Sequence, residues 1–369
     1  MIRSLILLLS LSLGVHAAPV ELAPLSRPLI PAAASATPAA PAADEARAEG
    51  SLQSVDAAVA ALPAPQTAGA ESSVAAGQAL ESALSTDVTA DFIAAHDDVQ
   101  AGRAGPLPEA ARQASYRLVR GFLGNHIHDY FRANMERLRE LGLDAEQIPV
   151  HTEGRRRQAL ELIERAVREA PHPVVLIGHS RGGTLVHDWY RRASPELKAK
   201  VAKLVVMQAP LRGTTYIEWW LSSRWRRFQA AKLGPWVYGV NVLRGLNELT
   251  RHTRAWVTRL LPAWQPGDLE KVLTVRTMIK PGVNRFYEKD RAEMARRGEP
   301  DSDGRVSAAG GRIEGARDVF LPGVDHQQLV LQRPDARRIR QGYAPHPYFH
   351  AGDSMEALVR LLFRQRDAS

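Results

Sequence analysis

One strand–turn–helix pattern in the middle of the chain most constrains its fold. Residues 173–177 form an apolar run that predicts a strand buried on both faces, and the hexapeptide Gly-His-Ser-Arg-Gly-Gly follows at 178–183. Residues 183–192 then predict a helix with one apolar side. Glycines around the serine allow a bend tight enough to lift its hydroxyl above the carboxyl end of the strand. The pattern therefore predicts a nucleophile elbow with Ser180 at its tip.

The beginning of the chain predicts export. Arg3 and the short apolar run 5–13, followed by small residues at 15–17, are typical of a secretory signal that is removed after residue 18. The apolar run is short for a membrane span. The sequence has no cysteine, so it forms no disulfide and has no thiol chemistry, which is compatible with export. We expect the protein in the periplasm, the outer envelope or the medium.

Composition divides the rest of the chain in two. Residues 19–111 are rich in alanine, proline and serine and poor in aromatic residues, so we expect a largely disordered spacer. The short patches 55–62 and 88–99 are candidates for marginal helices within it. Residues 112–369 carry the apolar mass for a core and predict the folded domain.

Charge and motifs exclude several classes of partner. The net charge is +8, from 48 basic and 40 acidic residues, and arginine supplies most of the positive charge. The chain has no zinc-ligand spacing, no phosphate-binding loop and no nucleic-acid-binding motif, so we expect no nucleic acid partner. His126 and His128 lack a third ligand. We predict no cofactor and no metal.

Strand and helix patterns alternate along the folded part. This alternation predicts an α/β fold with a mostly parallel sheet flanked by helices. Thr152 is the expected N-cap of one helix, which runs to residue 170. The further strands are expected at 116–119, 148–150, 201–207, 272–279 and 319–321, and the further helices at 130–141 and 354–363.

Four further segments stand out beside the elbow: the Arg-Gly-Phe-Leu-Gly loop at 120–124, the segment 208–214, the acidic loop 301–307 and the Gly-Val-Asp-His turn at 323–326. With these motifs, residues 116–363 resemble the α/β-hydrolase superfamily, and within it the bacterial lipases and related lipid esterases. Arg120 stands where the family usually has histidine, so the substrate preference set by that loop is open.

Three residues are predicted to form a catalytic triad. A serine hydroxyl needs an adjacent base, and in this fold the chain order is serine, acid, histidine. Ser180, Asp303 and His326 obey that order. The alternatives are Asp301 and Asp290 as the acid, and His346 and His350 as the base. His179 is expected to pack beside Ser180 rather than to act as the base.

The oxyanion hole is predicted to use two backbone N–H groups. One belongs to Arg181, the residue after the nucleophile, and the other to Phe122 in the loop 120–124. The side chain of Phe122 could equally close the pocket or line an acyl site.

A helical cap is expected at about 212–268. Six of the seven tryptophans lie between Arg212 and Trp264, and residues 212–254 carry eight basic and two acidic residues. Two interpretations stay open. The tryptophans could form the core of the cap while the arginines face water, or the cap could contact an anionic lipid surface.

These features predict an exported serine hydrolase that cleaves carboxylic esters, with lipid acyl esters or small esters as substrates. An acyltransferase or amidase with the same triad is the alternative enzyme. A non-catalytic protein that binds the surface of the envelope is the alternative outside enzymes, because a fold does not establish an activity.

Overall fold

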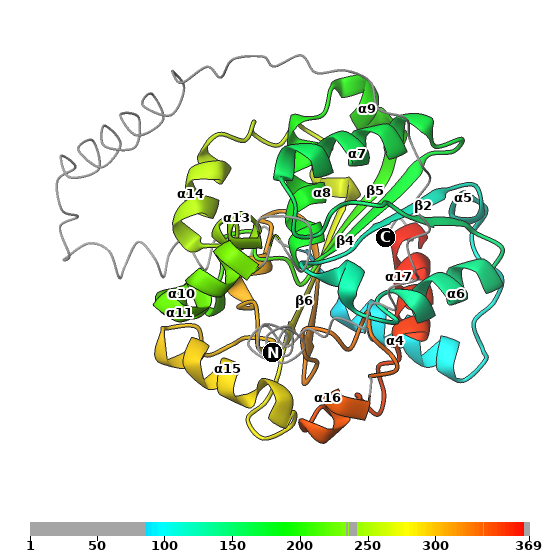
Figure 1. The fold of residues 1–369 in the computed structure, drawn as a ribbon. Helices are drawn as coiled ribbons and strands as arrows, with labels where there is room; N and C mark the ends of the chain where they lie inside the picture. Colours follow the sequence, from blue (N-terminus) through cyan, green and yellow to red (C-terminus); the bar gives the residue numbers. More distant parts are fainter. Residues whose placement is uncertain (1–85, 234, 236–241, 335, 365–369) are drawn as a thin grey trace, which may run out of the picture. The chain divides into compact units, whose positions relative to one another are not determined.

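The computed structural model describes residues 86–233, 235, 242–334 and 336–364 (Figure 1). The predicted signal at 1–18, most of the predicted spacer, and Trp236 lie outside the described residues. In the part of the chain that is described, no helix combines the length and the apolar character needed to cross a membrane.

A parallel sheet of seven strands forms the centre of the described residues. Its order is β1-β7-β6-β5-β4-β2-β3, and every neighbouring pair is parallel. The strands are β1 (Thr86–Asp87), β2 (Ser115–Val119), β3 (Asp144–Gln147), β4 (Val174–His179), β5 (Val201–Met207), β6 (Val272–Met278) and β7 (Arg317–Pro322). The prediction of a flanked parallel sheet is confirmed.

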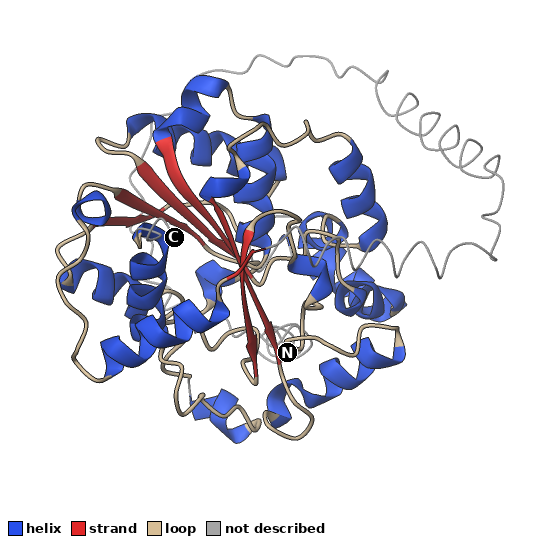
Figure 2. Cartoon of the chain, turned by 180° about the vertical axis from the view of Figure 1, so that it is seen from behind, coloured by secondary structure: helices blue, strands red, loops and turns tan. Residues whose placement is uncertain are grey.

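Helices cover both faces of this sheet (Figure 2). Helices α7 (Arg156–Glu169), α8 (Arg181–Arg192) and α9 (Pro195–Lys200) lie on one face. Helices α4 (Thr89–Gln100), α6 (Arg132–Glu140) and α17 (Ala351–Phe363) lie on the other. The remaining helices are α5 (Glu109–Arg112), α10 (Thr215–Ser222), α11 (Arg224–Phe228), α13 (Val242–Asn247), α14 (Arg251–Arg259), α15 (Arg285–Arg296) and α16 (Ala336–Arg340).

Strand β4 shows why its sequence is apolar throughout. Val174 and Leu176 pack in the core under α7 and α8, whereas Val175 and Ile177 pack in the core under α4, α6 and α17. Successive side chains of a strand point to opposite faces, so a strand covered on both sides needs an apolar residue at every position.

The folded unit begins earlier than residue 112. Strand β1 pairs with β7, and α4 packs against α17 with Phe92, His96 and Val99 buried. The predicted spacer is therefore wrong for residues 86–111. Helix α4 lies at the candidate marginal helix 88–99, and its apolar residues find their partners on distant elements, mainly on α17 and also on β7.

Two further expectations differ from the structure. The strand expected at 148–150 lies earlier, at β3, and Pro149 cannot donate a ladder hydrogen bond. Thr152 does not cap α7, whose N-cap is Arg155. The Thr152 hydroxyl instead donates to the carboxylate of Glu153 at 2.5 Å.

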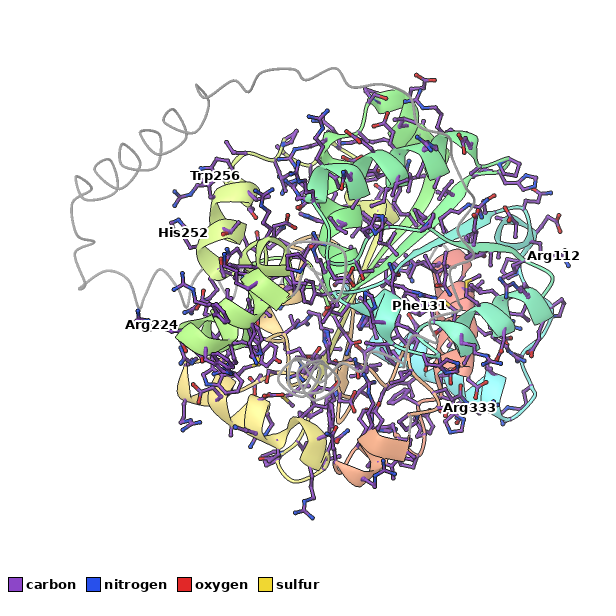
Figure 3. The ribbon with its side chains drawn as sticks, viewed as in Figure 1. Arg112, Phe131, Arg224, His252, Trp256 and Arg333 are labelled. Carbon is purple, nitrogen blue, oxygen red and sulfur yellow. The ribbon has the colours of Figure 1, made fainter. Side chains whose placement is uncertain are left out.

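The segment between β5 and β6 forms the expected helical cap, made of α10, α11, α13 and α14. Its tryptophans differ in burial: Trp220 is fully buried, whereas Trp225 and Trp256 are exposed. Arg224, His252 and Trp256 lie on the outer side of the cap, away from the sheet (Figure 3). A cap core formed by tryptophans is therefore confirmed for Trp220 and is wrong for Trp225 and Trp256.

Buried ion pairs fix the cap to the body of the fold. Arg254 of α14 donates to both carboxylate oxygens of Asp188 in α8, at 2.6 and 2.9 Å. Arg156 and His187 also contact this carboxylate. Burial alone would raise the pKa of Asp188, but the Arg254 guanidinium outweighs burial and lowers that pKa.

Candidate active site

Ser180 stands on a strained turn between β4 and α8. Its backbone has φ 56° and ψ −124°, a conformation that residues other than glycine rarely adopt. Its N–H donates to the carbonyl oxygen of Met207 at 2.9 Å, which holds the turn against β5. A Cβ atom on Gly182 would collide with the carbonyl oxygen of Val119. The glycine therefore lets α8 start close to β2.

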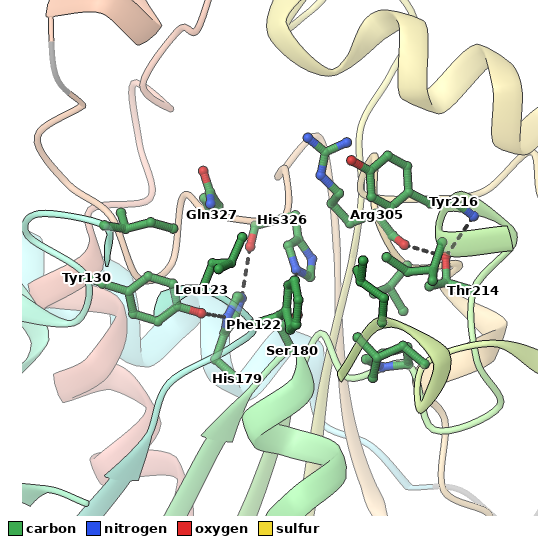
Figure 4. A pocket seen from close by; sticks show the side chains of 16 residues that line it. Phe122, Leu123, Tyr130, His179, Ser180, Thr214, Tyr216, Arg305, His326 and Gln327 are labelled. Atoms are coloured by element: carbon green, nitrogen blue, oxygen red, sulfur yellow. Dashed lines mark hydrogen bonds between the residues drawn. The ribbon is translucent and has the colours of Figure 1, made fainter. Parts of the chain in front are cut away.

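The structure brings Ser180, His326 and Asp303 together at the carboxyl edge of the sheet. Figure 4 shows the His326 ring above the turn that carries Ser180. Nε2 of His326 lies 2.9 Å from Oγ of Ser180, and Nδ1 of His326 lies 2.8 Å from Oδ2 of Asp303. Because the carboxylate accepts from Nδ1–H, Nε2 is free to accept the serine proton. The imidazole is therefore placed to act as a general base toward the hydroxyl.

Asp303 is held by its own turn. Its Oδ1 accepts the backbone N–H groups of Arg305 and Val306 at 2.9 and 2.8 Å, which leaves Oδ2 for His326. The alternative acids do not occupy this place. Asp301 is exposed, and Asp290 forms an ion pair with Arg305.

The alternative histidines have other partners. Nδ1 of His346 accepts the N–H groups of Tyr348 and Phe349 at 3.1 and 3.0 Å. His350 is the N-cap of α17 and lies 3.7 Å from the Asp353 carboxylate. Neither has a recorded contact with Ser180, so His326 is the imidazole that meets the hydroxyl.

The backbone N–H groups of Phe122 and Arg181, both near Ser180, have no acceptor among the described residues. The N–H of Gly121, by contrast, donates to the Tyr130 hydroxyl at 2.9 Å. Free N–H groups on the loop after β2 and at the first residue of α8 are what a developing oxyanion requires.

His179 is buried in a polar network behind Ser180. Its Nδ1 lies 2.5 Å from the Tyr130 hydroxyl, and its Nε2 lies 2.9 Å from both Oε1 of Gln208 and the carbonyl oxygen of His326. Two acceptors at Nε2 assign the proton to that nitrogen, and Nδ1 accepts from Tyr130. Burial and the neighbouring His326 lower the pKa of His179 well below its usual value. His179 thus contacts the backbone of His326 as a neutral ring.

Gln208 continues this network toward the acid. Its amide nitrogen donates to Thr277 Oγ1 at 2.5 Å and to the carbonyl oxygen of Asp325 at 2.8 Å. It also lies 3.4 Å from Oδ2 of Asp303. Sequence reasoning missed Tyr130, Gln208 and Thr277 as site residues, because their partners come from separate strands and loops. The polar Gln208 directly after the apolar strand β5 was the available signal.

A pocket of about 640 Å³, partly open to solvent, lies beside Ser180 and His326. Its polar wall holds Thr214, Tyr216 and Arg305, and the Arg305 guanidinium lies 4.1 Å from the centre of the Tyr216 ring. Burial raises the pKa of Tyr216 to about 12. The apolar wall is formed by Phe122, Leu123, Ile127, Ile217, Leu246 and Leu249.

Within the described ranges, no three histidine, aspartate or glutamate side chains cluster as metal ligands. His126 instead lies 3.2 Å from the Glu153 carboxylate, and His128 lies 3.1 Å from Asp129.

No model of a known protein family matches the sequence, and a comparison with curated proteins finds no match. Solved structures are similar to it. A metagenomic carboxyl esterase gives a TM-score of 0.63 at 16% identity, over 84% of this chain and 98% of that chain. Lipase 1 from Pelosinus fermentans gives 0.45 at 12%, over 69% and 100%. A lipase of Bacillus licheniformis in mature form gives 0.44 at 17%, over 58% and 85%.

Sheet order, elbow and the first of these similarities together define the class of the fold. This chain has the α/β-hydrolase fold, with a helical cap between β5 and β6. The resemblance drawn from the sequence is confirmed at that level.

Proposed function

We propose that this protein is a serine hydrolase that cleaves carboxylic esters, with Ser180 as the nucleophile. The observation that carries the proposal is the hydrogen-bonded chain from Ser180 through His326 to Asp303, next to two backbone N–H groups that have no acceptor among the described residues. A nucleophile, a base, an orienting carboxylate and an oxyanion site are the parts that acyl transfer requires.

In the first half of the reaction, Oγ of Ser180 attacks the ester carbonyl while Nε2 of His326 takes the hydroxyl proton. The carbonyl oxygen becomes an oxyanion that accepts from the N–H groups of Phe122 and Arg181. The carboxylate of Asp303 stabilises the imidazolium. The intermediate then collapses, the bond to the alcohol oxygen breaks, and His326 returns its proton to the leaving alcohol.

In the second half, water attacks the acyl group on Ser180 while His326 accepts a water proton. The carboxylic acid leaves and Ser180 regains its hydrogen. The pocket opens to solvent, which favours water as the acceptor over a second alcohol. Product analysis with and without an added alcohol separates hydrolysis from acyl transfer.

The test compares the wild type with Ser180→Ala on p-nitrophenyl esters. We expect turnover by the wild type and its loss in the variant, because no other hydroxyl group of the described residues is hydrogen-bonded to Nε2 of His326. A fluorophosphonate probe should label the wild type only. Equal hydrolysis by both proteins would reject the proposal. An unlabelled, inactive wild type would favour a non-catalytic binding protein.

We further propose esters with an apolar acyl chain as the substrate class. The apolar wall of the pocket supports this, since burying each CH₂ group contributes about 0.8 kcal/mol. A series of p-nitrophenyl esters should show kcat/KM rising from acetate to a medium chain. A steady decrease along the series would contradict the proposal.

We also propose that the cap contacts an anionic lipid surface. Trp225 and Phe228 of α11 are 58% and 50% exposed and stack at 5.7 Å, with Arg224 and Arg227 exposed beside them. Exposed aromatic rings next to arginines suit an interface of anionic headgroups. Cosedimentation with phosphatidylglycerol vesicles should weaken in Trp225→Ala/Phe228→Ala. It should stay unchanged in the control Ile339→Ala, an exposed apolar residue of α16. Equal cosedimentation of all three proteins would contradict this.

Export is proposed from the sequence alone. If residues 1–18 are a cleaved signal, N-terminal sequencing of the mature protein from a bacterial host should begin near Pro19. Recovery of the intact chain from the cytoplasm would contradict export.

A further inference from the structure

The side chain of Arg181 is buried beside the nucleophile and makes three short contacts. Its exposed fraction is 1%. One terminal nitrogen donates to the carbonyl oxygen of Thr152 at 2.6 Å, and the other donates to the carbonyl oxygen of Gly154 at 2.7 Å and to the Glu248 carboxylate at 2.6 Å. A planar guanidinium can serve several acceptors at fixed angles, which a lysine cannot do. The arginine therefore ties residues 152–154 to the first residue of α8.

The same segment supports the other half of the oxyanion hole. The Asn125 side chain donates to the carbonyl oxygen of Val150 at 2.8 Å, and His126 lies 3.2 Å from the Glu153 carboxylate. Asn125 and His126 belong to the short 3-10 turn Gly124–His126, which begins two residues after Phe122. Burial would raise the pKa of Glu153, but hydrogen bonds from His126 and Thr152 lower it. The carboxylate is thus available to hold this turn.

Glu248 connects the cap to the Arg181 guanidinium. It follows α13 directly, and its carboxylate also accepts the N–H of Arg156 at 3.4 Å. A Cβ atom on Gly245 of α13 would collide with the ring of Phe122 and the carbonyl oxygen of Glu153, so α13 packs directly on the oxyanion loop. The elbow, the segment 150–154, the oxyanion loop and the cap therefore meet around one guanidinium.

We propose that the Arg181 side chain is a positioning residue that sets the separation between the two oxyanion donors. Its backbone N–H is one donor, and its side chain holds the segment that supports the Phe122 donor. This inference rests on the proposed function. An oxyanion forms only in the tetrahedral state, so a displaced donor lowers kcat and leaves KM nearly unchanged.

The test uses Arg181→Met and Arg181→Lys with a p-nitrophenyl ester. We expect Arg181→Met to lower kcat by roughly 100-fold, as loss of one oxyanion donor does, with KM within about threefold of the wild type. Arg181→Lys reaches fewer acceptors and should recover part of that loss. The matched control is Arg157→Met on α7, whose side chain is 90% exposed and pairs with Glu161. It should match the wild type.

A transition-state analogue separates positioning from general loosening of the fold. A boronic acid forms a tetrahedral adduct on serine, so its affinity should fall in parallel with kcat across the variants. The affinity of a ground-state product, the carboxylic acid, should change less than threefold. If Arg181→Met does not fold, Arg181→Lys carries the same comparison.

Two results would overturn the inference: kcat of Arg181→Lys and Arg181→Met within twofold of the wild type, or a loss confined to KM. Failure of the proposed function looks different, because the wild type itself would then neither hydrolyse the ester nor react with the fluorophosphonate.

Discussion

Nε2 of His326 lies 2.9 Å from Oγ of Ser180, although 146 positions separate the two residues along the chain. Oδ2 of Asp303 accepts from Nδ1 of the same imidazole, which places the ring proton on Nδ1. Nε2 is then able to accept the hydrogen of the Ser180 hydroxyl. The contact between the imidazole and the hydroxyl thus depends on a carboxylate that has no hydrogen bond to Ser180 among the described residues.

Asp303→Asn tests that dependence. The amide oxygen can still accept the N–H groups of Arg305 and Val306, so the turn should keep its shape. The amide nitrogen facing His326 would favour the wrong tautomer, and we expect kcat to fall by about 10⁴-fold. The control is Asp301→Asn, two residues earlier and exposed, which should match the wild type. A loss below tenfold in Asp303→Asn would contradict this role.

Tyr130→Phe tests the network behind the nucleophile. The hydroxyl accepts from Gly121 and donates to His179, so its removal leaves two buried polar groups without a partner. We expect the free energy of unfolding to fall by about 1–3 kcal/mol, and kcat to fall with it because Gly121 adjoins the Phe122 donor. Urea denaturation and ester kinetics measure the two effects. Unchanged stability would show that water replaces the hydroxyl.

The sequence predicted the elements with strong local patterns. Strand β4 and the elbow were predicted because an apolar run followed by Gly-x-Ser-x-Gly leaves few alternatives. Asp303 and His326 were chosen by chain order and by neighbouring turn residues, Gly304 and Gly323, with other aspartates and histidines left open. The structure distinguishes these candidates by their distances from Ser180, and the spacing of residues along the sequence does not give such distances.

What the sequence did not predict depends on contacts between distant segments. Helix α4 was expected only as a marginal helix within a spacer, because its buried residues pack mainly on α17, more than 250 positions away. Tyr130 and Gln208 carry no motif of their own, and they become site residues only because β2, β4 and β5 lie side by side. The same holds for the Arg181 side chain, whose three acceptors come from two other segments.

Arg254→Met tests how the cap is attached. The substitution leaves Asp188 buried with Arg156 and His187 as its remaining partners, and we expect a loss of about 3 kcal/mol in the free energy of unfolding. Urea denaturation followed by tryptophan fluorescence measures it. The double variant Arg254→Met/Asp188→Leu removes the orphaned charge and should recover part of the loss. A double variant that loses the full sum of the single effects would contradict a direct pairing.

Exchanging Asn284 and Asp325 tests how the loop that carries His326 is held in place. The Asn284 amide donates to the Asp325 carboxylate at 2.7 Å, next to His326. Burial raises the pKa of Asp325 to about 7. In Asp325→Asn, the new amide NH₂ group faces the NH₂ group of Asn284, so two donors meet and neither has an acceptor. We expect this variant to lose both stability and kcat.

The double variant Asn284→Asp/Asp325→Asn restores one donor and one acceptor and should recover most of that loss. Thermal unfolding and ester kinetics on the two single variants and the double variant form the cycle. Additive losses would show that the two side chains do not depend on each other.

We expect His96 to make the stability of the protein sensitive to acid, independently of the active site. Its ring is buried among Phe92, Tyr348 and Phe349, and neither ring nitrogen has a hydrogen-bond partner in the described part of the chain. Burial lowers the pKa of His96 in the folded state below its usual value of 6.5. Below pH 6.5, His96 is therefore protonated in the unfolded chain while it stays neutral in the folded protein. The free energy of unfolding then falls by up to about 1.4 kcal/mol for each pH unit until the folded pKa is reached.

His96→Leu removes this titration and keeps an apolar side chain on α4. We expect the variant to match or exceed the wild type at pH 7.5, because two unsatisfied polar atoms disappear, and to exceed it by more at pH 5.5. Urea denaturation across that range measures the difference, with the exposed His172→Leu as the control. If the two stability curves stay parallel from pH 7.5 to 5.5, the ring of His96 takes up its proton equally in the folded and unfolded chains, and burial does not control it.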